Sequence, residues 1–183
     1  MSLTRRKFLN TAALSSLALG MPHLWIPGAQ AATSLKADTP IKVGLLFSLT
    51  GGLAVPEEDS TLVMQYAIDE INAAGGVKGM PIEPVIVDAK SDFKVYSAKT
   101  KEMILRDKVI SIFGCYTSAS RKAILPTVMQ QDNLLFYPTC YEGAECTQNC
   151  IGTGPLANQH SFDLIPFMVD NFGPKVFFVG SNY

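Results

Sequence analysis

The chain has 183 residues, which is enough for one ordinary domain and too few for two comfortable ones. Fifteen Lys and Arg residues face sixteen Asp and Glu residues, so the net charge of −1 removes the simplest argument for a nucleic-acid-binding protein. Hydrophobic residues make up 48% of the chain, which can therefore bury a core. Four Cys and two His are too few for a disulfide-dense scaffold or a His-rich metal site.

Residues 1–31 have the pattern of an export signal. Arg5, Arg6 and Lys7 are the only charges in the first 35 residues, and the uncharged stretch that follows is long enough to cross a bilayer. Its Ala, Ser, Gly and Pro content argues against a membrane span. Because small residues at the end of this stretch are typical of a cleavage site, we expect a secretory signal peptide that is removed after Ala31.

The start of this segment, from Thr4 to Asn10, resembles the bacterial twin-arginine consensus, and an ordinary secretory signal with two Arg residues is the alternative. The twin-arginine export machinery carries folded proteins, often with a cofactor, so cofactor sites need to be considered. Removal of the three positive charges lowers the net charge from −1 to −4. We expect a mildly acidic mature protein in the periplasm.

Strand and helix patterns alternate along the mature chain, after a linker at residues 32–40. Mostly apolar runs of strand length occur at residues 41–47, 82–87, 109–113, 134–137 and 176–179. Helices are predicted from Asp59 or Ser60 to Ala74, and at about 94–106, from Ser118 or Ser120 to 132, and at 158–171. The first helix is expected to bury one apolar face made of Leu62, Val63, Tyr66, Ala67, Ile71 and Ala74.

This alternation predicts an α/β fold, with a parallel sheet covered by helices on both faces. Ligands of such sheets bind at the carboxyl ends of the strands. The loops of interest are therefore residues 48–52, 114–120, 138–143 and 180–183. Because the sequence stops directly after an apolar run, we expect it to be a fragment of a longer protein.

The sequence lacks the patterns that are typical of nucleotide binding, of a nucleophile elbow and of a zinc site. The loop at 48–52 has no dinucleotide or phosphate-binding spacing, and the segment after residue 113 has no nucleophile elbow. Cys115 could be a helix-stabilised thiolate, but a buried structural thiol is the favoured interpretation. Cys140, Cys146 and Cys150 lack the spacing of a zinc site, and in an oxidising compartment any pair of them could form a disulfide. We expect no metal, no cofactor and no catalytic residue.

Hydroxyl groups gather where the predicted strands end. Tyr116 and Ser118 follow one strand, Tyr137 and Thr139 lie at the end of the next, and Tyr183 follows the last. The backbone N–H groups at the start of the helix near Ser118 would point into the same cleft. Such a site suits an uncharged carbonyl compound with amino groups. The alternative is that the hydroxyls near helix starts are simple caps.

Four segments resemble the urea and short-chain amide-binding proteins of ABC transporters and the related amide sensor of bacterial amidase operons. They are Phe113 to Lys122 (Phe-Gly-Cys-Tyr-Thr-Ser-Ala-Ser-Arg-Lys), Phe136 to Pro138, Tyr141 to Gly143, and Val179 to Tyr183. The segment from Asp69 to Val77 is similar to the wider branched-chain amino-acid-binding class.

The resemblance implies a type I periplasmic-binding-protein fold, with two α/β lobes hinged around a cleft. Lobe 1 would span residues 41–152, and residues 153–183 would start a truncated lobe 2. Carried over by position, Tyr116, Ser118, Tyr137, Thr139 and Tyr183 would bind the ligand by hydrogen bonds and stacking. Cys140 and Cys150 depart from the family pattern, and we predict that they form a disulfide.

The resemblance predicts an exported binding protein that delivers urea or a short-chain amide to the membrane subunits of an ABC permease. One alternative is a branched-chain or other amino-acid-binding protein, although the loops at 48–52 and 114–120 offer no Asp or Glu for an ammonium group. A second alternative is an exported enzyme or metal-cofactor protein, as the twin-arginine pattern and the cysteines would allow.

Overall fold

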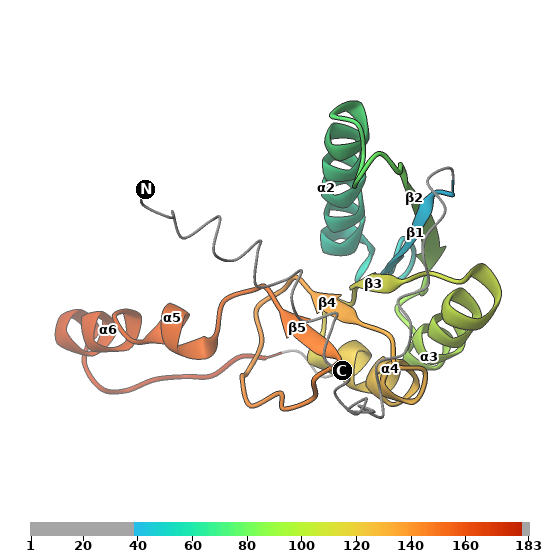
Figure 1. Ribbon diagram of the computed structural model, residues 1–183. Coiled ribbons are helices and arrows are strands. Elements are labelled where there is room, and N and C mark those ends of the chain that lie inside the picture. The colour runs from blue at the N-terminus through green and yellow to red at the C-terminus, as the bar shows by residue number, and fades with distance from the viewer. Residues whose placement is uncertain (1–38, 181–183) are drawn as a thin grey trace, which may run out of the picture. The chain divides into compact units, whose positions relative to one another are not determined.

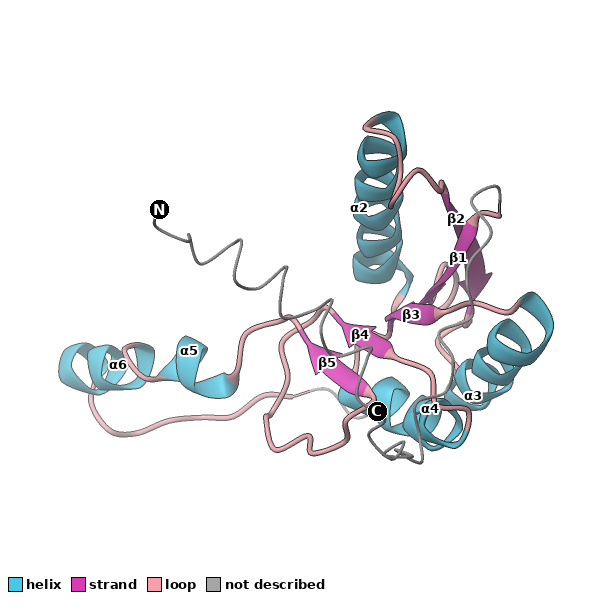
Figure 2. Cartoon of the chain, in the orientation of Figure 1, coloured by secondary structure: helices cyan, strands magenta, loops and turns pink. Residues whose placement is uncertain are grey.

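Five parallel strands form one sheet in the order β2-β1-β3-β4-β5. The computed structural model describes residues 39–180 (Figures 1 and 2). The strands are β1 Ile41–Phe47, β2 Ile82–Asp88, β3 Ser111–Gly114, β4 Leu135–Tyr137 and β5 Cys150–Gly152. The helices are α2 Ala54–Ala73, α3 Phe93–Glu102, α4 Ser118–Gln130, α5 Ala157–Ser161 and α6 Leu164–Phe172, and a π-helical turn, Met103–Asp107, follows α3. The predicted signal peptide, most of the predicted linker and Tyr183 lie outside the described residues.

The core has two parts, one on each face of the sheet. On one face, side chains of β1, β3 and β4 pack against Tyr96 of α3 and Ile124 and Val128 of α4. On the other face, Val43, Leu45 and other β1 side chains pack against α2. This is the arrangement that near-continuous apolar strands require, and it confirms the predicted α/β class.

Helix α2 begins at Ala54, five residues before the predicted start, and presents a different face to the sheet. The prediction that this face is buried is wrong. Leu62, Val63 and Tyr66 are 56%, 66% and 65% exposed, and Ala67, Ile71 and Ala74 are exposed as well. Thr61 and Ile68 are buried instead. The rotation of the helix follows from a polar anchor at its start, described below, which draws the Glu57 side of the helix against the sheet.

The turn between α2 and β2 explains the residues that resemble the wider binding-protein class. The side chain of Asn72 accepts a hydrogen bond from the N–H of Ile82 at 2.7 Å and donates one to its C=O at 2.8 Å. Gly76 has a φ of 71°, and a Cβ there would lie 2.2 Å from the carbonyl oxygen of Met80. The segment therefore needs an amide side chain and a glycine in these places.

Three predicted elements near the end of the described chain are corrected. Residues 176–179 form no strand, because no described strand lies beside them to take their backbone hydrogen bonds. The helix predicted over 158–171 is divided into α5 and α6, with Pro166 in the first turn of α6. Strand β5 lies where the sequence analysis predicts no strand. Within residues 39–180, no helix is both long and apolar enough to cross a membrane.

Candidate ligand-binding site

A groove of about 430 Å³ lies at the carboxyl ends of β3 and β4. It is lined by Tyr116, Thr117, Ser118, Tyr137, Thr139, Cys140, Pro155 and His160. Four of the five predicted ligand-binding residues, Tyr116, Ser118, Tyr137 and Thr139, are therefore brought together in one place. Their role in binding stays a prediction.

The chain leaves β3 through a tight turn that aims the next residues into the groove. A Cβ on Gly114 would lie 2.2 Å from the carbonyl oxygen of Leu46, so glycine permits the close approach of β3 to β1. Cys115 follows with a φ of 65° and is fully buried. Burial raises the pKa of this thiol, which agrees with a structural cysteine rather than a reactive thiolate.

Helix α4 is capped by Thr117, and not by Ser118 or Ser120 as predicted. The Thr117 hydroxyl oxygen accepts a hydrogen bond from the N–H of Ser120 at 3.1 Å. Ser118 is then the first residue of the helix. Its side chain is free of the capping role and lines the groove.

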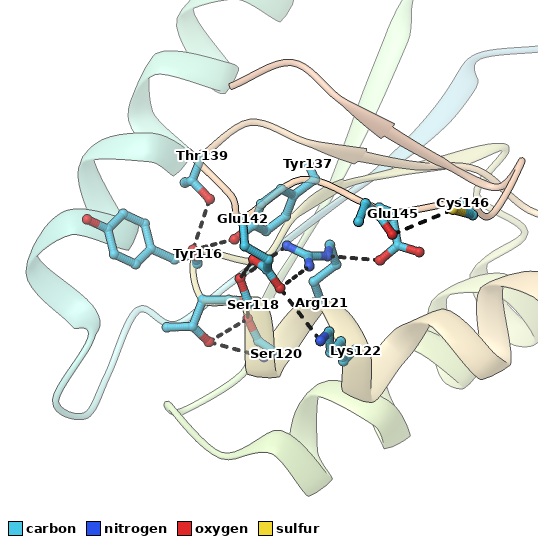
Figure 3. Close-up of polar contacts among 12 residues, drawn as sticks. Tyr116, Ser118, Ser120, Arg121, Lys122, Tyr137, Thr139, Glu142, Glu145 and Cys146 are labelled. Atoms are coloured by element: carbon cyan, nitrogen blue, oxygen red, sulfur yellow. Dashed lines mark hydrogen bonds and ion pairs between the residues drawn. The ribbon is translucent and has the colours of Figure 1, made fainter. Parts of the chain in front are cut away.

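The backbone carbonyl group of Tyr116 connects the loop after β3 to the end of β4. It accepts a hydrogen bond from the Tyr137 hydroxyl at 2.8 Å and one from the Thr139 hydroxyl at 2.9 Å (Figure 3). The loop after β3 is thus tied to the end of β4 by two of the predicted ligand-binding side chains, Tyr137 and Thr139. The Tyr116 ring extends away from this junction (Figure 3).

A buried arginine that the sequence interpretation did not single out organises the loop after β4. Arg121 is 1% exposed, and its guanidinium group lies 4.7 Å from the ring centroid of Tyr137 and 5.5 Å from that of Tyr141. It forms ion pairs with Glu142 at 3.0 Å and Glu145 at 3.4 Å. We call these five residues the Arg121 clamp. A basic residue at the start of a helix and two acids some twenty residues later are the only sequence signal for it.

The Arg121 clamp reaches the groove through Glu142. The Ser118 hydroxyl donates a 2.5 Å hydrogen bond to Oε2 of Glu142 (Figure 3). This bond, the residue's own backbone N–H and Arg121 lower the pKa of Glu142 to about 2. Glu142 is therefore ionised at neutral pH and accepts the hydrogen bond from Ser118 as a carboxylate. Lys122 adds a longer contact at 3.6 Å.

The structure does not form the predicted disulfide between Cys140 and Cys150, since all four cysteines are free thiols. The strand register gives the reason. Cys150 is paired with Leu135 at the start of β4, whereas Cys140 lies beyond Tyr137 at the other end of that strand. Two strand residues alone span roughly 7 Å, and a disulfide needs Cα atoms within about 7 Å.

The predicted loop at residues 48–52 does not line the groove. It is held by Asp88, which accepts hydrogen bonds from the N–H groups of Leu49 and Thr50 and from the Thr50 hydroxyl. Ser91 holds it further by accepting from the N–H of Leu53 at 3.1 Å. The loop is thereby fixed to the end of β2 and the turn before α3.

Glu57, near the start of α2, is the polar anchor mentioned above. Its carboxylate accepts hydrogen bonds from the Ser48 N–H at 2.5 Å and from the Tyr96 hydroxyl. Its other oxygen, Oε1, has no hydrogen-bond partner among the described residues. Burial raises the pKa of Glu57, and the hydrogen bonds from Tyr96 and Ser48 oppose that shift.

A family model described as a periplasmic binding protein domain matches residues 41–183. The "Leu/Ile/Val-binding protein homolog 8" of Brucella suis is 28% identical over 167 residues. That alignment covers 88% of this chain and 40% of the relative, so the chain spans well under half the length of the curated relatives it matches. The names of these relatives describe binding proteins and not enzymes.

Solved structures of binding proteins also match the chain. The branched-chain amino acid transporter substrate-binding protein LivJ of Streptococcus pneumoniae, in complex with isoleucine, is 26% identical with a TM-score of 0.67. The match covers 73% of this chain and 39% of that one. The leucine-binding protein LivK of Thermotoga maritima, at 18% identity and a TM-score of 0.61, supports the fold alone.

Proposed function

Because the chain belongs to the periplasmic binding protein domain family and has the type I fold, we propose that it is part of an exported solute-binding protein of an ABC transporter. It would capture a small polar organic molecule and deliver it to the permease subunits in the membrane. The observation that carries the proposal is the hydroxyl-lined groove at the carboxyl ends of β3 and β4.

A branched-chain amino acid is the first candidate ligand. The relatives named above are Leu/Ile/Val-binding homologues or bind isoleucine, and they favour this alternative over the urea and amide prediction. The N–H groups of Ser118 and Ala119 at the start of α4 have no partner within residues 39–180, and they suit a carboxylate oxygen.

Urea or a short-chain amide is the second candidate, and the composition of the groove favours it. None of the described lining residues is acidic, and the nearby carboxylate of Glu142 is already held by Arg121, Lys122 and Ser118. An ammonium group would need a carboxylate from elsewhere in the protein. A neutral amide needs only hydrogen bonds.

The proposed mechanism is closure of two lobes around the ligand. Residues 41–152 would form lobe 1, and residues 153–183 would begin lobe 2, with Tyr183 approaching the ligand from that side. A ligand that hydrogen-bonds both lobes stabilises the closed state through its higher affinity for that state. No bond is made or broken.

Export by the twin-arginine machinery and cleavage after Ala31 complete the proposal. Replacing Arg5 and Arg6 by Lys should abolish periplasmic accumulation, and the mature protein from wild-type cells should begin at Ala32. Unchanged export of the double Lys variant would instead indicate an ordinary secretory signal.

The ligand is tested by calorimetric titration of the mature full-length protein with leucine, isoleucine, urea and acetamide. Saturable binding of leucine or isoleucine alone would establish the first candidate, and binding of urea or acetamide alone would establish the second. Thr139→Val should weaken binding about 5-fold, the effect of one hydrogen bond of about 1 kcal/mol. Thr147→Val, outside the groove, is the matched control. Binding of none of the four ligands would contradict the proposed ligand classes.

A further inference from the structure

We propose that four hydroxyl groups of the groove, on Thr117, Ser118, Tyr137 and Thr139, form a wall of hydrogen-bond acceptors, which selects ligands by their N–H donors. The inference rests on the proposed function and deepens it, because it concerns which end of a ligand this wall recognises. A hydroxyl group has one hydrogen to donate and two lone pairs that accept. A hydroxyl group whose hydrogen is already used in a hydrogen bond within the protein can therefore offer a ligand only its lone pairs.

Two of the hydroxyls are committed to the same backbone carbonyl. Tyr137 and Thr139 both donate to the C=O of Tyr116, at 2.8 and 2.9 Å. A carbonyl oxygen has two lone pairs, so this pair of bonds uses its full capacity. If either hydroxyl turned to donate to a ligand, it would give up a protein hydrogen bond. Both groups therefore have only lone pairs left for a further partner.

The third hydroxyl is committed more strongly. Ser118 donates to the ionised carboxylate of Glu142 at 2.5 Å, a charge-assisted hydrogen bond. Arg121 Nη1 donates to the same Ser118 oxygen at 3.2 Å, so one of its lone pairs is also used. The Arg121 clamp holds Glu142 in place by the 3.0 Å ion pair. Ser118 therefore offers a ligand one remaining lone pair and no hydrogen.

The fourth hydroxyl follows the same rule. Thr117 donates to the Ser120 hydroxyl oxygen at 3.1 Å while it accepts from the Ser120 N–H. Tyr116 is the exception, since its hydroxyl has no hydrogen-bond partner within the described part of the chain and its side chain is 38% exposed. Tyr116 and the first N–H groups of α4 are what remains to donate to a ligand oxygen.

The wall therefore distinguishes the two ends of each candidate ligand. The amino groups of urea, the amide nitrogen of acetamide and the ammonium group of an amino acid all carry the N–H donors that these lone pairs need. A carboxylate has only acceptor oxygens, so it could form no hydrogen bond with these hydroxyl groups. A site built to hydrogen-bond an N–H group disfavours an analogue that lacks it, because its polar groups are then left unpaired.

The experiment compares ligand pairs that differ in the N–H group, with the full-length protein. Acetamide is paired with acetone, and leucine with 4-methylpentanoate. Glu142→Ala frees the Ser118 hydrogen, so it should reduce the affinity ratio within the pair that binds by about 5-fold or more. Glu145→Ala is the matched control, because it removes a carboxylate from Arg121 without touching the groove, and it should keep the wild-type ratio. An unchanged ratio in Glu142→Ala would overturn the proposal.

A measurement without ligand separates this inference from the proposed function. In the wild-type protein, carbon-13 NMR of the Glu142 carboxyl should give a pKa of about 2. Ser118→Ala should raise that pKa, whereas Ser118→Thr, which keeps a hydroxyl, should leave it low. A pKa unaffected by Ser118→Ala would refute the acceptor wall even if ligands bind. A Ser118-dependent pKa in a protein that binds none of the tested ligands would support the wall and contradict the proposed function.

Discussion

Glu57 is a fully buried carboxyl group, and one of its oxygens lacks a hydrogen-bond partner among the described residues. Burial raises its pKa above the ordinary value of 4.5, so the folded chain binds this proton more tightly than the unfolded chain does. The contribution of Glu57 to the free energy of unfolding therefore falls as the pH rises from about 4.5 through the raised value, and is constant above it.

Glu57→Gln removes this titration, and the comparison is made by urea unfolding between pH 4 and pH 8. We expect the wild-type protein to lose stability relative to Glu57→Gln as the pH rises, with no further change above the folded pKa. Glu58→Gln, which removes an exposed carboxylate from the next position of α2, is the control. A difference between wild type and Glu57→Gln that is flat over the whole range would contradict the assignment.

At the scale of the elements, the close approach of β3 to β1 depends on one glycine. A Cβ on Gly114 would lie 2.2 Å from the backbone oxygen of Leu46, and backbone cannot move aside as a flexible side chain can. Gly114→Ala should therefore lower the free energy of unfolding by about 2–3 kcal/mol. Gly52→Ala is the control, because a Cβ there meets nothing within 4 Å. Equal unfolding midpoints for the two variants would contradict this account of the strand pair.

The elements that the sequence predicts well are those with a local cause. The apolar run of β1 has the predicted bounds, and α3 begins within one residue of its predicted start, where Asp92 caps it. The buried face of α2 could not be predicted, because Glu57 sets the rotation of the helix through partners at Ser48 and Tyr96. An acidic residue at such a position normally indicates an exposed face.

In the site, too, features with a local cause were predictable and features that depend on distant contacts were not. The clustering of Tyr116, Ser118, Tyr137 and Thr139 follows from their place at the ends of parallel strands, which topology brings together. The pairing of Ser118 with Glu142 could not be predicted, because the two residues are 24 positions apart and meet only through the path of an irregular loop. The direction of each hydroxyl hydrogen likewise depends on contacts that are distant in sequence.

For the whole molecule, ligand binding should stabilise the fold and make the protein more compact. A ligand that binds only the folded state adds about 2.7 kcal/mol at a concentration of 100 times its Kd. We therefore expect the ligand identified by calorimetry to raise the Tm of the full-length protein and to lower its radius of gyration in small-angle scattering. A higher Tm with an unchanged radius of gyration would contradict lobe closure while leaving binding intact.

The segment from Tyr137 to Tyr141 both lines the groove and holds the chain that leaves the sheet. Thr153 donates from its N–H to the carbonyl of Tyr137 at 2.9 Å, and a Cβ on Gly154 would lie 2.1 Å from the carbonyl oxygen of Thr139. We therefore expect a displacement of Thr139 to move the outgoing chain at Thr153 and Gly154 with it, because the two segments meet backbone to backbone.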